Sequence, residues 1–237
     1  MSLKVLWKGI LPLKCIKWNK KTFQEFHLPP KYNSKVHKNW LNHIKENPND
    51  YDGTIVFLDN FRLKSKYLFL NVSLIKFSTV IYMVKNKIPV KKGIGLLSTQ
   101  YLVFSPNKRY ILVGERSLSQ IYYPGFTACP GGMLEINDLD KSPETALIRE
   151  LHEEVKLSFD SAAFLTEIIA GWNNVSVTFL ISAVVSKSYD FNPIKTVSAE
   201  QDEWEGSLRW LSIEDLKTMK PNQLLDGLAY YKSKIMK

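Results

Sequence analysis

The stretch that decides the fold is Cys129–Leu157, which reads CPGGMLEINDLDKSPETALIRELHEEVKL. Ser142 followed by Pro143 is a typical helix start, because serine accepts a hydrogen bond from a free backbone N–H and proline carries no N–H that needs a partner. Apolar residues then recur at four-residue spacing, which predicts a helix to about residue 155 with one buried face. Those residues are Leu147, Leu151 and Val155.

The same predicted helix carries three carboxylates on one face. Glu150 and Glu154 are four residues apart and Glu153 is three from Glu150, so all three lie within about one helical turn. Such a cluster is stabilised by a hard divalent cation, and Mg²⁺ and Mn²⁺ prefer oxygen ligands. The glycine turn at Gly131 lets a backbone carbonyl approach the same ion, and Arg149 is placed to fix a glutamate rotamer. The alternative is a solvent-facing helix whose acids pair with lysines.

These residues resemble the signature of the Nudix hydrolase family. The signature is a Gly, five residues, a Glu, seven residues and then Arg-Glu-aliphatic-x-Glu-Glu-x-Gly-aliphatic. Gly132 supplies the first glycine, and residues 149–154 match the second half residue for residue. The loop between them has three extra residues, so Asp138 or Asp140 stands in for the first Glu, which is largely structural in the family. Lys156 replaces the late glycine.

The resemblance implies an α+β chain whose residues 93–237 form a Nudix α/β/α sandwich with a mixed sheet. It also implies Mg²⁺- or Mn²⁺-dependent hydrolysis of the pyrophosphate of a nucleoside diphosphate linked to another moiety. The metal ligands implied are Glu150, Glu153, Glu154 and the Gly131 carbonyl, and Glu150 and Glu153 are also expected to be catalytic.

Residues outside this box complete the expected site. Family members often take a general base, or another metal ligand, from a later loop, and here residues 198–210 read SAEQDEWEGSLRW. We expect Glu203 or Glu205 to serve as this group, with ordinary exposed acids as the alternative. Trp204 is expected to stack on a nucleobase, with a place in the core as the alternative. Arg116 is expected to clamp phosphate, or else to form a surface ion pair. The other acids of the loop are Glu200 and Asp202.

Charge divides the chain into a basic front part and a mildly acidic remainder. Residues 1–93 contain 18 Lys and Arg against 5 Asp and Glu, a balance of +13, and residues 94–237 contain 14 against 18, a balance of −4. We expect residues 1–92 to form a small N-terminal accessory α+β domain that ends in a linker over residues 85–92. Its expected elements are a helix that Ser34 caps and that runs to about Glu46, and strands at Thr54–Leu58, Tyr67–Ile75 and Thr79–Val84.

The front part also resembles, more weakly, that of UDP-sugar pyrophosphatase-type Nudix proteins. The likeness rests on Trp40-Leu41, Asn47-Pro48 and Tyr51-Asp52-Gly53, and it implies UDP-glucose as a preferred substrate. A common helix–turn–strand unit is the alternative. Two rival functions are RNA cap removal, suggested by the basic front part, and a catalytically silent Nudix-fold binding module.

The remaining pattern bounds the class of protein. The chain has 237 residues, 45% of them hydrophobic, and only two cysteines, so a disulfide scaffold is excluded. The most apolar stretch, Tyr67–Val84, is interrupted by polar residues, and no signal peptide pattern occurs. We therefore expect a cytoplasmic protein with a small-molecule nucleotide partner, RNA as a less favoured partner and no membrane partner. The oligomeric state is left open.

Further strands are expected at residues 96–104, 110–115, 172–185 and 207–210, and helices from residue 213 and over 222–236.

Overall fold

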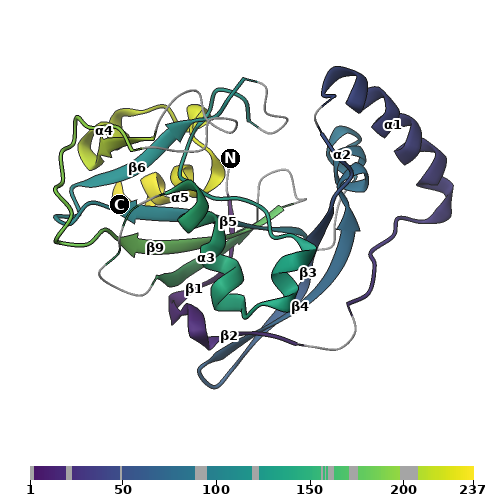
Figure 1. Ribbon diagram of the computed structural model, residues 1–237, viewed down its shortest axis with the longest axis horizontal. Coiled ribbons are helices and arrows are strands. Elements are labelled where there is room, and N and C mark those ends of the chain that lie inside the picture. The colour runs from purple at the N-terminus through teal and green to yellow at the C-terminus, as the bar shows by residue number, and fades with distance from the viewer. Residues whose placement is uncertain are drawn as a thin grey trace.

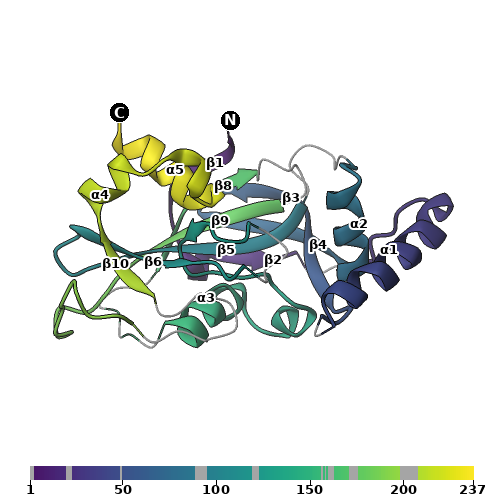
Figure 2. The same ribbon diagram turned by 90° about the horizontal axis from the view of Figure 1, so that it is seen from above.

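A mixed sheet forms the centre of the molecule in the computed structural model, with helices on both of its faces (Figures 1 and 2). The structure describes residues 3–19, 23–48, 50–88, 95–118, 123–155, 157, 159, 163–170, 176–197 and 208–237, without the side chains of Glu150 and Glu154. The strands are β1 (Lys4–Pro12), β2 (Ile16–Trp18), β3 (Thr54–Lys64), β4 (Tyr67–Lys76), β5 (Gly95–Phe104), β6 (Tyr110–Glu115), β7 (Thr127–Ala128), β8 (Phe164–Ala170), β9 (Ser176–Val184) and β10 (Arg209–Ser212). The α-helices are α1 (Asn33–Glu46), α2 (Phe77–Lys85), α3 (Pro143–Glu154), α4 (Ile213–Thr218) and α5 (Asp226–Ile235).

Strands that lie far apart in the sequence meet in this sheet. Among the described residues the order is β1-β8-β9-β5-β3-β4-β2, and β6 pairs with β5, β7 and β10. Most neighbours are antiparallel, but β5 and β9 run parallel, as do β2 and β4. Parallel neighbours need a crossover connection, and between β5 and β9 that connection contains α3.

The two faces of the sheet are covered by different helices (Figure 2). Helix α3 packs on one face, where Leu147 and Leu151 share a core with Leu97, Tyr101 and other odd-numbered residues of β5. Helices α4 and α5 cover the other face over β5 and β6. On that same face α2 packs against β3 and β4, and α1 lies outside α2, where the rings of Trp40 and Phe77 meet edge to face. The arrangement is the expected α/β/α layering.

Two predictions for the front part are wrong. Residues 79–84 are part of helix α2 and not a strand. Four consecutive residues, Val80 to Met83, are buried, and a short run buried on all sides has no periodicity that distinguishes a strand from a helix. Helix α1 ends at Glu46 as expected but begins at Asn33, so Ser34 lies in its first turn and is not its N-cap.

In the second part the expected elements are present with shifted boundaries. Strands β5 and β6 lie where predicted. Strand β9 covers Ser176–Val184 of the predicted 172–185, and residues 171–175 lie outside the described residues. The last strand is β10, and Ser212 caps α4 by accepting a hydrogen bond from the backbone N–H of Asp215. The final helix starts later than predicted, at Asp226. Strand β8 was not predicted.

The two predicted domains share this sheet. Strand β3 pairs with β5, and β1 pairs with β8 from Lys4 opposite Ala170 to Pro12 opposite Phe164. Residues 89–94, which contain half of the predicted linker and the boundary after residue 92, lie outside the described residues, and Lys85, the first residue of that linker, ends helix α2. The division into 1–92 and 93–237 therefore stays a prediction. In the part of the chain that is described, no helix is long and apolar enough to span a bilayer.

Candidate active site

Helix α3 begins and packs as its sequence predicts. The Ser142 hydroxyl accepts a hydrogen bond of 3.1 Å from the backbone N–H of Thr145, and Pro143 occupies the first helical position. Leu147, Leu151 and the capping residue Val155 are fully buried. The residues that the periodicity assigned to the buried face are thus the ones that attach the helix to the sheet.

A buried ion pair joins α3 to the loop before it. Arg149 donates to both carboxylate oxygens of Asp138, from Nε at 2.9 Å and from Nη2 at 3.0 Å. Asp138 is 1% exposed, and Lys141 Nζ lies 3.7 Å from its Oδ1. Bidentate pairs of this kind fix geometry as well as charge. Of the two aspartates proposed to stand in for the first Glu, Asp138 is the one that pairs with Arg149.

The inserted loop is closed by its own hydrogen bonds. Residues 136–140 form a 3₁₀ helix, and Glu135 and Asp138 each accept a hydrogen bond from the other's backbone N–H, an arrangement known as a capping box. The Tyr51 hydroxyl donates to Glu135 Oε1 at 3.4 Å. The negative charge of Glu135 raises the pKa of Tyr51, and burial adds to that rise. The loop is therefore held from both sides, by the box helix and by the front part of the chain.

The glycine turn lies against the backbone of β5. Gly131 has a φ of +153°, and a Cβ at this position would overlap the Thr99 carbonyl and lie 2.9 Å from Gln100 Cα. Residues on both sides of Gly131 pair with β5, since Thr99 N–H donates to Gly132 O at 2.9 Å and Tyr101 N–H to Pro130 O at 2.8 Å. Only glycine fits so close to another backbone.

The three box glutamates lie on the last two turns of α3. Glu153 is about half exposed, and its Oε2 accepts a hydrogen bond of 2.6 Å from Arg149 Nη1, the expected contact of Arg149 with a glutamate. Glu150 and Glu154 are one turn apart on the helix, and their side chains are not among those described. Among the described side chains no group of three His, Cys, Asp or Glu is placed to hold a metal ion. The donor set is nonetheless all oxygen, which fits a hard cation such as Mg²⁺ or Mn²⁺.

The other predicted site residues are placed only in part. Arg116 follows β6, is half-buried, and its backbone N–H donates to Phe126 O at 2.9 Å. Residues 198–207 lie outside the described residues, so Glu203, Trp204 and Glu205 stay predictions, as do Glu200 and Asp202. Two further residues differ in exposure: His152 of α3 is exposed, whereas Cys129 is buried, which raises the pKa of its thiol.

Two contacts to the box come from residues that the sequence did not indicate. The indole Nε1 of Trp18 donates to Lys141 O at 3.1 Å, one residue before the cap of α3. The Tyr101 hydroxyl donates to Leu147 O at 2.6 Å inside the core. Their partners are 123 and 46 residues away in the sequence, and no local pattern reports a contact across such a distance.

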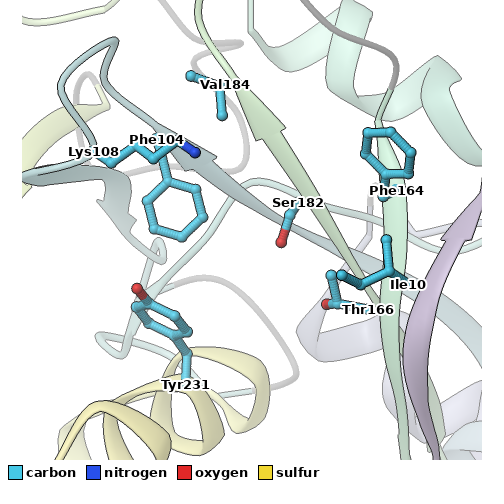
Figure 3. Close-up of a pocket in the computed structure, with 8 residues that line it drawn as sticks. All are labelled: Ile10, Phe104, Lys108, Phe164, Thr166, Ser182, Val184 and Tyr231. Atoms are coloured by element: carbon cyan, nitrogen blue, oxygen red, sulfur yellow. The ribbon is translucent and has the colours of Figure 1, made fainter.

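A cavity of about 370 Å³ lies on the other side of the sheet (Figure 3). Tyr231 of α5 and Phe104 of β5 form one side of it, and Thr166 and Ser182 face it from β8 and β9. Helix α5 covers this face, whereas the box helix covers the opposite one. The carboxylates of α3 therefore do not line this cavity, and the candidate site is not built on it. The remaining lining residues are Ile10, Lys108, Phe164 and Val184.

Comparison with known proteins gives a family for this architecture. The NUDIX domain model matches residues 98–230, more than half of the chain and all of the box. No curated protein matches the sequence.

Several solved structures resemble the chain distantly. A bifunctional NMN adenylyltransferase/ADP ribose pyrophosphatase from Francisella tularensis, complexed with AMP and a Mn ion, is 20% identical over 67% of this chain and 45% of that one, with a TM-score of 0.44. The NUDIX domain of Shewanella oneidensis NrtR, complexed with ADP ribose, is 19% identical over 60% and 88%, with a TM-score of 0.43. A MutT protein from Methanosarcina mazei is 18% identical over 60% and 95%, with a TM-score of 0.40.

The assignment rests on the domain match. The structure agrees with it, because the box contains a capped helix that Arg149 and Asp138 join to the preceding loop. With its mixed sheet between helices, its Arg149–Asp138 pair and its matching residues 98–230, the chain belongs to the Nudix hydrolase family of pyrophosphohydrolases.

Proposed function

We propose that the chain hydrolyses the pyrophosphate linkage of a nucleoside diphosphate derivative with Mg²⁺ or Mn²⁺, and that nucleotide sugars such as UDP-glucose are its preferred substrates. The observation that carries the proposal is the Arg149–Asp138 pair. It joins helix α3, which carries the glutamates, to the loop between the glycine turn and α3, although this loop is three residues longer than in the family signature. The reaction adds water across one P–O–P bond, so UDP-glucose would give UMP and glucose 1-phosphate.

The box residues would hold the metal. Glu150, Glu153 and Glu154 supply carboxylate oxygens from one end of α3, and the Gly131 carbonyl would supply a further oxygen from the loop. A bound divalent ion neutralises charge on the phosphoryl oxygens and makes a bound water more acidic. The contact of Arg149 Nη1 with Glu153 Oε2 fixes the rotamer of Glu153, and ordered ligands need less reorganisation when substrate binds.

Residues outside the box would position the substrate. Arg116 follows the strand next to β5 and would bind a phosphate oxygen through its guanidinium group. Glu203 or Glu205 would accept the proton of the attacking water, and Trp204 would stack on the base. The UDP-sugar preference rests on the resemblance of the front part, which the Tyr51–Glu135 contact joins to the box loop.

The test is a panel of hydrolysis assays with product masses. The full chain is incubated in Mg²⁺ with UDP-glucose, ADP-ribose, dinucleoside polyphosphates, coenzyme A and capped RNA. We expect UMP and glucose 1-phosphate to be the fastest products. Faster release of a nucleoside diphosphate from capped RNA would replace the nucleotide-sugar preference with cap removal, and no turnover of any substrate would favour a silent binding module.

A single variant tests the metal role. Glu154→Gln keeps the size of the side chain but removes its charge, so we expect turnover in Mg²⁺ to fall at least about a hundredfold, with thermal unfolding nearly unchanged. Glu144→Gln, an exposed acid in the first turn of the same helix, is the matched control and should keep its activity. Full activity of Glu154→Gln would contradict the assigned role.

A further inference from the structure

The outer ends of β2, β3 and β4 carry cations and aromatic rings on one face of the sheet. We name this surface the basic aromatic platform. The hairpin that joins β3 and β4 and the short strand β2 form the lower end of the molecule in Figure 1. The platform consists of Lys17, Arg62, Lys64, Lys66, Tyr67 and Phe69.

Strand register places these side chains on the same face. Tyr67 is opposite Lys64 and Phe69 is opposite Arg62 in the β3–β4 pairing, and Lys17 of β2 is the partner of Phe69. Side chains of directly opposed residues share a face. The alternate residues of β4, including Leu68 and Leu70, are fully buried in the core that contains α3. The platform therefore faces away from α3.

The two rings are accessible and have cations near them. Their centroids are 6.4 Å apart at an interplanar angle of 59°, and both side chains are about half-buried. Lys17 Nζ and Lys66 Nζ lie 5.8 and 5.6 Å from the Tyr67 centroid, and Arg62 Cζ lies 5.7 Å from the Phe69 centroid. These distances are near the outer limit of a cation–π contact. A flat ligand can therefore displace the flexible cations and stack on the rings.

The charged side chains of this surface are almost all positive. In the described strands β2, β3 and β4, Asp59 is the one acid, and its carboxylate accepts a hydrogen bond of 2.8 Å from the Ser73 hydroxyl. All four cations of the platform are exposed. A cluster of exposed cations attracts an anionic polymer, and phosphates spaced along a chain suit cations distributed over three strands.

A row of amides continues the same face toward the middle of the strands. The Asn71 side chain donates to Asn60 Oδ1, and the Asn19 amide donates to Asn71 Oδ1 at 2.6 Å. Amide groups donate to and accept from the edges of bases, whereas they are costly to insert into lipid. This row favours a nucleic acid over a membrane surface as the occupant.

We propose that the basic aromatic platform binds single-stranded nucleic acid, with bases stacked on Tyr67 and Phe69 and phosphates bound by Lys17, Arg62, Lys64 and Lys66. Partly exposed aromatic rings on a sheet surrounded by cations are suited to unpaired bases, because every base has a face that stacks. The site lies on the opposite face of the sheet from α3 and does not depend on the proposed hydrolysis.

The first experiment measures stacking. Fluorescence anisotropy with labelled single-stranded RNA and DNA of about 12 nucleotides gives the Kd of the full chain. Tyr67→Leu and Phe69→Leu keep apolar bulk and remove the ring, so each should weaken binding at least about fivefold, the smallest loss expected for one stacked base. Tyr230→Leu on α5, at the other end of the sheet, is the matched control and should leave Kd unchanged. Circular dichroism and thermal melting verify that each variant is folded.

The second experiment measures charge and remains informative if a ring variant unfolds. The triple variant Lys17→Gln, Arg62→Gln and Lys66→Gln is compared with Lys35→Gln, Lys38→Gln and Lys45→Gln, which removes the same charge from exposed positions of α1. Between about 50 and 200 mM salt, the platform triple should reduce the slope of log Kd against log salt by about 2. The α1 triple should change the slope little.

Three results would overturn the proposal. One is no binding of either oligonucleotide at low salt, and another is an equal loss of affinity in the platform variants and their controls. The third is a preference for a different partner, either duplex bound as tightly as single strand or vesicles rich in phosphatidylserine bound in place of the oligonucleotides.

Discussion

On the face of the sheet that α3 covers, charged groups meet at short range, whereas on the opposite face of β2, β3 and β4 the cations lie over aromatic rings at nearly 6 Å. Arg149 contacts Asp138 at 2.9 and 3.0 Å and Glu153 at 2.6 Å. The cations of the platform are 5.6–5.8 Å from ring centroids. The first arrangement fixes side chains before a ligand arrives, and the second leaves them free to adapt to one.

The box and strand β3 also differ in how a carboxylate is held. Asp138 is almost fully buried and is bound by Arg149 through both oxygens. Asp59, at the bulge of β3, is held by a neutral hydroxyl from Ser73, and burial raises the pKa of Asp59. A carboxylate needs a cation to remain charged at little cost inside a protein. The carboxylate of the box is therefore matched by a cation within the fold, whereas that of Asp59 in β3 is not.

Removing the cation from the box should have the largest effect on stability. Arg149→Met leaves Asp138 buried without its main partner, and breaking such a pair costs about 3–5 kcal/mol. Urea denaturation measures the loss. Adding Asp138→Asn should recover part of it, and Lys217→Met, which breaks the exposed pair with Glu214, should cost about 0.5 kcal/mol or less. Similar losses in the two methionine variants would show that the Arg149–Asp138 pair contributes no more to the free energy of unfolding than a surface pair does.

Adding one methyl group to the glycine turn should have the next largest effect. In Gly131→Ala the new Cβ overlaps the backbone of β5, so we expect a loss of about 2 kcal/mol or more and reduced turnover. Gly53→Ala is the control, because its Cβ would meet only the ring of the exposed Tyr51. Equal melting temperatures for Gly131→Ala and the wild type would contradict the close approach.

A third change tests whether β2 stabilises the box. This strand has Trp18 on the face of α3 and Lys17 on the platform. Trp18→Phe removes the hydrogen bond to Lys141 O, so it should cost about 1 kcal/mol more than the lost ring volume alone. Trp210→Phe supplies the comparison, because Trp210 is also buried and its Nε1 has no partner among the described residues. Equal losses of unfolding free energy for the two variants would show that the hydrogen bond from Trp18 does not contribute to stability.

The smallest effect concerns Asp59 and is a change with pH. Because burial raises the pKa of Asp59 above 3.8, its contribution to stability is fully present below that value and is lost as pH rises through the folded-state pKa. Asp59→Asn should flatten this part of the profile and change stability at pH 7 by only about 0.5 kcal/mol, since the side chain is partly exposed. Asp190→Asn, at an exposed site, is the control. A profile of Asp59→Asn parallel to that of the wild type would contradict the expectation.

The sequence predicts the box helix well because its signals are local. Ser142, Pro143 and the repeat of Leu147 and Leu151 all act within one helix, and each is found as expected. The choice between Asp138 and Asp140 could not be made in the same way, because it depends on which carboxylate reaches Arg149 across a loop without periodicity.

The elements that were missed have other causes. Helix α2 is apolar on nearly all sides, so its pattern is that of a buried strand. Strand β8 contains a buried Glu167 that pairs with Lys234 of α5 at 2.6 Å, and an acid in the middle of an apolar run argues against a strand when the sequence is considered alone. The roles of Glu203 and Glu205 stay predictions, because residues 198–207 lie outside the described residues.

The pairing of β1 with β8 has a consequence for synthesis of the chain. Lys4 is opposite Ala170, and β8 is the one partner of β1 among the described strands, so β1 stays unpaired until residues 164–170 have been translated. Sheets closed by such distant pairings form late and slowly. A nascent chain that pauses before residue 164 would leave an open strand edge next to its apolar core, and a chaperone that shields this edge would raise the yield of folded protein.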